Sequence, residues 1–232
     1  MTVTDPEFND RIKGLREDLA GQGRAVQRMI EAAVDAFFDN DRAKAQGAID
    51  TDSEIDRVDV KIERDAVQVL YDAMQRGIRL EHHDVRTIFT LVKVNNEFER
   101  IADCAVSIAE KVGTAGAGTL PSRMRVMANS VIGIMQTTNA ALARWDTVAA
   151  QLVLASDDTT EAFREAIVRD TEEDLARGEH SVPYALMLQV IAANLGRMAD
   201  HCTNVAEQVI YVQTGKVVRH SGSRWSQPEP ID

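Results

Sequence analysis

The feature that most constrains the fold of this chain is an internal repeat. Residues 95–110 read NNEFERIADCAVSIAE, and residues 192–207 read AANLGRMADHCTNVAE. The two segments lie 97 positions apart and align Asp103 with Asp200. Upstream of them, residues 52–65 align with residues 157–170 at an offset of 105 positions. A repeat of two consecutive segments in the same order indicates that one structural unit occurs twice along the chain.

Apolar periodicity predicts that this unit is a bundle of helices. Apolar residues recur every three or four positions, the spacing that places them on one face of a helix. The pattern occurs in three segments of each half, at residues 26–37, 55–74 and 85–112, and again at residues 124–152, 163–175 and 187–209. Only 5% of the residues are aromatic and only five are prolines, which favours helices over sheets.

The predicted fold class is therefore all-α, with two tandem three-helix bundles related by internal duplication. The first bundle is expected at residues 1–112 and the second at residues 123–215. Residues 113–122 read GTAGAGTLPS, and their small side chains and proline predict a linker. Residues 216–232 lack periodicity and are expected to form a disordered tail. The first helix is expected to continue through its weak polar interruption toward Ile49.

The charge balance excludes some classes of partner. The 37 acidic residues exceed the 26 basic ones, which gives a formal net charge of -11. Such a field repels nucleic acids and anionic membranes, so no direct nucleic-acid binding is expected. The longest uncharged segment, residues 126–143, carries several amide and hydroxyl side chains, so no membrane span is predicted. A polar N-terminus and two cysteines inside helical patterns, Cys104 and Cys202, predict a reduced, cytoplasmic protein with both thiols buried.

Acidic residues four positions apart recur in register in both halves. Residues i and i+4 share one helix face, so each pair projects two carboxylates together, at a repulsive cost of about 0.2–0.5 kcal/mol. A bound cation would reverse that cost. Asp200 lacks a partner because Gly196 stands four positions before it. The acids of this pattern, and the predicted metal-binding residues, are Asp52, Asp56, Glu99, Asp103, Asp157, Glu161 and Asp200.

The acid pairs of neighbouring helices are expected to meet. Helices joined by one turn run antiparallel, so the pair that opens the second helix, Asp52 and Asp56, is expected near the third-helix pair. Up to four carboxylates would form a hard oxygen site suited to Mg²⁺, Mn²⁺, iron or, less selectively, Zn²⁺, and the sequence does not choose among them. Alternatively, each pair is a solvated face or an ion-pair partner for a nearby arginine. Recurrence in both halves favours the metal site.

Several segments of the chain resemble one family. FERIADCAVSIAE at residues 98–110 and LGRMADHCTNVAEQVIYVQTG at residues 195–215 resemble the paired helix signature of the PhoU phosphate-signalling regulators. The same holds for IDTDSEIDRVDVKIE at residues 49–63 and for HHDVRTIFTLVKVNNEFERIAD at residues 82–103. The similarity runs through both halves in order and covers nearly the whole chain.

The resemblance implies a function and a set of partners. It implies a cytoplasmic, all-helical protein, often a homodimer, that represses phosphate uptake and the phosphate-starvation response. Such proteins are understood to link the ATPase of the phosphate ABC transporter to a sensor histidine kinase, and to reach the membrane only through these partners. The family's Glu/Asp-x-x-x-Asp motifs bind metal. Gly196 stands where the family usually has glutamate, so the second-half site is expected to bind metal weakly or not at all. In the first half, Ser107 stands where the family usually has asparagine, the match of Asn204.

Two other functions remain open from the sequence. The clustered carboxylates could serve a metal-dependent hydrolase or phosphatase that activates a water molecule on the metal. No histidine or lysine converges with them as a general acid in the sequence pattern, which favours a non-catalytic adaptor. The remaining alternative is a helical scaffold without metal.

Overall fold

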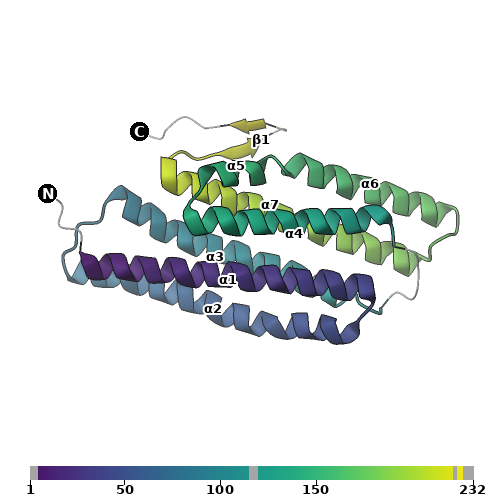
Figure 1. Ribbon diagram of the computed structural model, residues 1–232, viewed down its shortest axis with the longest axis horizontal. Coiled ribbons are helices and arrows are strands. Elements are labelled where there is room, and N and C mark those ends of the chain that lie inside the picture. Colours follow the sequence, from purple (N-terminus) through teal and green to yellow (C-terminus); the bar gives the residue numbers. More distant parts are fainter. Residues whose placement is uncertain (1–4, 115–119, 222–223, 227–232) are drawn as a thin grey trace.

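The computed structural model describes residues 5–114, 120–221 and 224–226, and helices make up nearly all of this part of the chain (Figure 1). The all-α prediction is confirmed. Two bundles of roughly parallel and antiparallel helices lie side by side, the first built by α1 to α3 and the second by α4 to α7. The helices are α1 (Pro6–Asp39), α2 (Arg42–Gln75), α3 (His82–Ala109), α4 (Ser122–Arg144), α5 (Thr147–Leu154), α6 (Asp157–Ala176) and α7 (Val182–Thr214).

A tight turn separates α1 from α2, so the prediction that the first helix continues to Ile49 was wrong. Asn40 adopts a left-handed conformation with φ of 51°, which ends α1. Asp41 then caps α2, because its carboxylate accepts hydrogen bonds from the backbone amides of Ala43 at 2.9 Å and Lys44 at 3.1 Å. A left-handed asparagine followed by a capping aspartate is a strong stop and start signal that the apolar pattern alone does not show.

The second bundle repeats the first with one break. The apolar pattern at residues 124–152 predicted one helix, but α4 ends at Arg144, where Trp145 is left-handed with φ of 53°. Asp146 caps the short helix α5 through the amides of Val148 and Ala149. At the offset of 105 positions, α5 matches the first two turns of α2 and α6 matches the rest. The equivalent of α2 is therefore divided in two.

The two bundles join along α3 and α7, which pack against each other, with α1 against α4 beside them. Their facing apolar residues belong to one continuous buried core, which includes Phe98, Leu91 and Leu195. At the α1–α4 contact, Asn139 donates hydrogen bonds to the Gly23 carbonyl and to Gln27, both at 3.0 Å. A Cβ atom at Gly23 would overlap the Asn139 amide oxygen and lie 2.8 Å from Phe98 Cζ. Glycine is therefore required for the close approach of the halves.

The C-terminal segment differs in part from the expected disordered tail. Strands β1 (Arg219–Ser221) and β2 (Arg224–Ser226) pair in an antiparallel hairpin. The rest of the predicted tail at residues 222–223 and 227–232, and residues 115–119 of the predicted linker, lie outside the described residues. Among the helices that the structure describes, none has both the length and the apolar character needed to cross a membrane.

We expect Gly23→Ala to lower the free energy of unfolding by about 1–3 kcal/mol, because the added methyl group overfills the contact with Asn139 and Phe98. Gly14→Ala is the matched control in the same helix, since no atom lies within 4 Å of its ideal Cβ position. The control should stabilise the protein by up to about 1 kcal/mol through helix propensity. Urea unfolding followed by circular dichroism measures both variants. Equal effects of the two would contradict the close-contact interpretation.

Candidate functional site

The acids predicted in the first half lie where α2 and α3 pack together. Partial burial, followed by the negative charges of Asp56 and Asp103, raises the pKa of Asp52. Partial burial and then the charge of Asp103 raise the pKa of Glu99, with smaller contributions from Asp59 and Asp56, while Arg100 opposes the rise. The four predicted acids therefore act on one another across the two helices. Asp52 and Asp56 do not open their helix, because α2 begins earlier, at Arg42.

A fifth acid, Asp59, was missed by the sequence analysis. It lies three residues after Asp56 on the same side of α2, a spacing that could have revealed it. Partial burial raises its pKa, and the charges of Glu63 and Asp56 add to the rise. Its side-chain oxygen accepts a hydrogen bond of 2.6 Å from Asn95 Nδ2, which also donates to the Asp59 carbonyl at 3.0 Å. Asn95 is fully buried on α3, so this bond ties α2 to α3 beside the acids.

We name these five acids the first-half cluster: Asp52, Asp56, Asp59, Glu99 and Asp103. The nearby cations neutralise it weakly. Arg100 is mostly exposed and lies 3.5 Å from a Glu99 oxygen and 3.8 Å from an Asp103 oxygen. Arg57 donates its Nε hydrogen to the Ser53 carbonyl at 3.0 Å. The cluster thus presents an excess of negative charge at the junction of two helices.

The donor chemistry of the first-half cluster fits a hard metal ion, since it consists of carboxylate oxygens. In the described ranges, no three histidine, cysteine, aspartate or glutamate side chains converge closely enough to enclose an ion. The carboxylates line a shared surface, and side-chain rotation within that surface would be needed to bring several onto one metal. Mutual repulsion keeps such groups apart until a cation is present.

The predicted acids of the second half also approach one another, but an arginine accompanies them. Loss of hydration and then the charge of Asp157 raise the pKa of Asp200, with a smaller contribution from Glu161. The Arg164 guanidinium forms two hydrogen bonds with the Glu161 carboxylate, at 2.7 and 2.5 Å, and thereby lowers the pKa of Glu161. Gly196 is buried, and a Cβ atom there would lie 3.2 Å from Arg164 Cδ. Asp157, Glu161, Arg164 and Asp200 are the second-half cluster.

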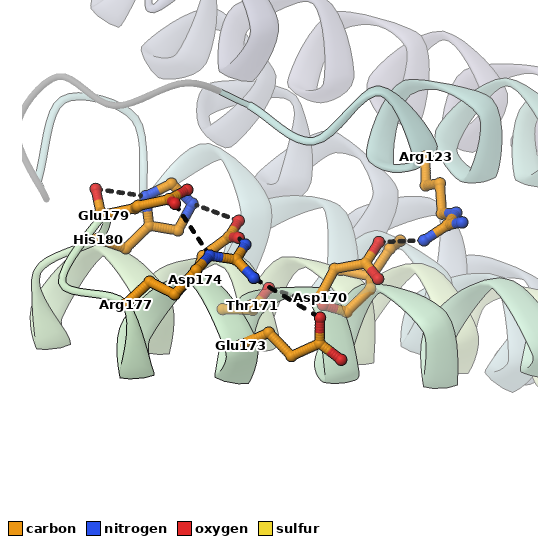
Figure 2. Close-up of polar contacts among 9 residues, drawn as sticks. Arg123, Asp170, Thr171, Glu173, Asp174, Arg177, Glu179 and His180 are labelled. Carbon is orange, nitrogen blue, oxygen red and sulfur yellow. Dashed lines mark hydrogen bonds and ion pairs between the residues drawn. The ribbon is translucent and has the colours of Figure 1, made fainter.

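Acids farther along α6 are paired with cations as well (Figure 2). Arg123 from α4 forms an ion pair with Asp170. Near the end of the helix, Arg177 pairs with Asp174, and His180 Nε2 lies 3.3 Å from the same carboxylate. In the first half, Asp65 is the counterpart of Asp170, and it lies 3.3 Å from Lys61 Nζ. Away from the two clusters, the halves therefore neutralise their acids in the same way.

His201 is partly buried between the halves. Its Nδ1 atom lies 2.7 Å from Glu97 Oε2 on α3, and Asn204 Nδ2 donates to the same oxygen at 3.0 Å. The histidine therefore joins α7 to α3. Cys104 and Cys202 are buried and free, as predicted. Burial raises the pKa of the Cys104 thiol to about 11 and that of the Cys202 thiol to about 12, so both thiols stay protonated near neutral pH.

The fold and these motifs define a class, a duplicated helical-bundle protein with acidic motifs at matching places in its two halves. The PhoU domain matches residues 19–112 and again residues 124–209. The chain belongs to the PhoU family, as the sequence resemblance predicted.

Relatives in sequence and structure extend over nearly the whole chain. The phosphate-specific transport system accessory protein PhoU homolog 1 of Thermotoga maritima is 26% identical, over 92% of this chain and 92% of that protein. The PhoU homolog of Pseudomonas aeruginosa is 26% identical, over 93% of this chain and 89% of that protein. The crystal structure of PhoU from Pseudomonas aeruginosa has a TM-score of 0.81 at 25% identity, covering 90% of this chain and 99% of that one. The phosphate transport system regulatory protein PhoU from Streptococcus pneumoniae shares the fold, with a TM-score of 0.85 at 19% identity over 92% of this chain and 100% of that one.

In metal-free buffer at pH 7, we expect Asp52→Asn to raise the free energy of unfolding by about 0.5 kcal/mol, because it removes like-charge repulsion. A raised folded-state pKa means that the acid's protonated form stabilises the fold. This stabilisation is complete below the ordinary value of 3.8 and is lost as the pH rises through the raised pKa. The difference in the free energy of unfolding between the variant and the wild type should therefore become smaller toward about pH 4. Glu54→Gln, an exposed acid on the same helix, is the control and should show no such difference. A difference in the free energy of unfolding that does not change with pH would contradict the electrostatic interaction among these acids.

Proposed function

We propose that this protein is a negative regulator of phosphate uptake and of the phosphate-starvation response. It acts as a non-catalytic adaptor between the ATPase of a phosphate ABC transporter and a sensor histidine kinase. The observation that carries the proposal is the match to the PhoU domain in both halves. The names of the relatives support it, since they are accessory proteins of the phosphate-specific transport system.

The proposal also specifies the location of the protein and its class of partner. It resides in the cytoplasm and reaches the membrane surface only through its partners. The net charge of -11 supports protein partners rather than nucleic acid or anionic lipid, because a strongly acidic surface is repelled by both. Two copies form a homodimer, as the family resemblance implies.

We propose further that the first-half cluster holds a metal ion, with iron, manganese, zinc or magnesium as candidates. Its carboxylates would be the ligands. A bound cation would neutralise the repulsion that raises the pKa of Asp52 and of Glu99, and it would hold α2 against α3. The surface formed by these two helices would then keep one shape for docking. This role requires no chemical step on the metal.

A metal-dependent hydrolase is the alternative, and the surroundings of the cluster give it little support. Hydrolysis with a metal-activated water usually needs a general acid that releases a proton near neutral pH. Among the residues that the structure describes, Arg100 contacts the cluster acids, and a guanidinium group holds its proton too firmly for that task. Lys61 forms ion pairs with Asp18 and Asp65. Phosphoester turnover that disappears in Glu99→Gln would favour the hydrolase instead.

Metal analysis tests the first-half cluster. We expect the protein purified without chelator to contain bound metal, and Glu99→Ala with Asp103→Ala to lose most of it, because two of five ligands are removed. Inductively coupled plasma mass spectrometry gives the ratio of metal to protein. The control changes Glu172 and Glu173 to alanine, two exposed acids of α6 outside both clusters, and should leave the metal content unchanged. A metal-free wild type would refute the metal proposal.

Gene deletion tests the regulatory role. Cells that lack the gene should express a phosphate-uptake reporter in phosphate-rich medium, and the wild-type gene should restore repression. Glu54→Gln, outside both clusters, should restore repression equally well. Unchanged expression of the reporter in the deletion strain would contradict the regulatory proposal. The result of the metal analysis does not depend on that outcome.

A further inference from the structure

The two clusters differ at two equivalent positions. On α6, residues 157, 161 and 164 correspond to residues 52, 56 and 59 of α2, at the offset of 105 positions. Arg164 therefore takes the place of Asp59. On α7, Gly196 takes the place of Glu99, at the offset of 97 positions. Five carboxylates give the first-half cluster a formal charge of -5, whereas three carboxylates and one guanidinium give the second-half cluster a formal charge of -2.

The two replacements fit each other in space. The methylene stem of Arg164 passes over Gly196, since a Cβ atom at position 196 would lie 3.2 Å from Arg164 Cδ. A glutamate at position 196 would therefore meet the arginine stem. With glycine there, the guanidinium reaches Glu161 and forms two hydrogen bonds, at 2.7 and 2.5 Å. A planar guanidinium with two parallel bonds to one carboxylate is the strongest common form of such an ion pair.

The arginine also acts on a second acid of the cluster, Asp200. The positive charge of Arg164 opposes the rise in the pKa of Asp200. The side-chain hydrogen bond with Glu161 raises the pKa of Arg164, and Asp200 contributes to the same rise. Arg164 is thus bonded to Glu161 of α6 and packs against Gly196 of α7. A cation between the acids of two helices is the arrangement proposed for the metal ion in the first half.

The difference is specific to the clusters. Outside them, acids of both halves form ion pairs with basic side chains. In the second half Asp170 pairs with Arg123 (Figure 2), and in the first half Asp65 pairs with Lys61. Inside the first-half cluster, position 59 is an acid that is tied to Asn95. Inside the second-half cluster, the equivalent position supplies the cation itself.

We propose that Arg164 is a built-in counterion that replaces a metal ion in the second-half cluster, so that this chain takes up metal in its first half only. The first-half part of this statement rests on the proposed function. The second-half part rests on the Arg164 contacts and on Gly196. Both halves of one duplicated protein would then have a cation among their acids, an exchangeable metal ion in the first half and an arginine side chain in the second.

The test rebuilds the lost site. The double variant Arg164→Asp with Gly196→Glu restores the full set of acids in the full-length protein. After chelator treatment and loading with Mn²⁺, we expect the variant to bind about twice as much metal as the wild type, because both clusters would then offer five carboxylates. Arg144→Asp removes a positive charge from an exposed site outside the cluster and is the matched control, with unchanged metal content. Circular dichroism verifies that each variant is folded.

A second variant removes the cation without adding ligands. The starting protein carries Glu99→Ala and Asp103→Ala, which remove ligands of the first-half cluster. Adding Arg164→Gln to it should lower the melting temperature measured in chelator. Addition of Mn²⁺ should then restore part of the lost melting temperature. The same background with Arg164 intact should not respond to Mn²⁺. This thermal measurement decides the question if the rebuilt variant fails to fold.

The outcomes separate this proposal from the proposed function. A wild type that loses metal when Asp157 and Asp200 become asparagine would overturn the counterion proposal, because the second-half cluster would then bind metal despite Arg164. A metal-free wild type whose rebuilt variant gains metal would refute only the first-half metal and would support the role of Arg164. A rebuilt, folded variant that gains no metal would overturn the counterion proposal.

Discussion

The packing of α3 against α7 is the constraint on which the rest of the structure depends. Both helices bury long apolar faces in a continuous core, and they join the two bundles. Because the two helices carry the repeated segments, each duplicated acid reaches the same place in its own half. The charge of Asp103 raises the pKa of Asp52 on α2, and the charges of Asp157 and Glu161 on α6 raise the pKa of Asp200. The central helix pair thus sets where negative charge collects.

The two clusters differ in the groups that offset the repulsion among their carboxylates. In the first-half cluster, Asp52, Asp59 and Glu99 are partly buried and weakly neutralised. Protonation of these acids relieves the repulsion among them, and the proposed metal ion would do the same. The second-half cluster contains Arg164 and the glycine that makes room for it. A glycine inside a helix costs about 1 kcal/mol relative to alanine.

Much of the fold could be predicted from the sequence because both the repeat and the apolar period are local signals. The helices of the first half and α7 lie where the periodicity indicated. The errors occurred at turns. Asn40 and Trp145 end helices through left-handed backbone conformations, and the capping residues Asp41 and Asp146 start the next ones. Apolar spacing continues across such short turns, so it reported one helix where the structure has two.

The sequence by itself determined the duplicated architecture, the family and the four acids of the first half, since these follow from order and spacing along the chain. It also identified the loss of an acid at Gly196. Only the tertiary structure decided that Asn95 of α3 ties Asp59 beside those acids and that Arg164 lies over Gly196. These facts depend on contacts between helices that are distant in sequence, where a difference of one helix turn or one side-chain rotamer decides whether two charges meet.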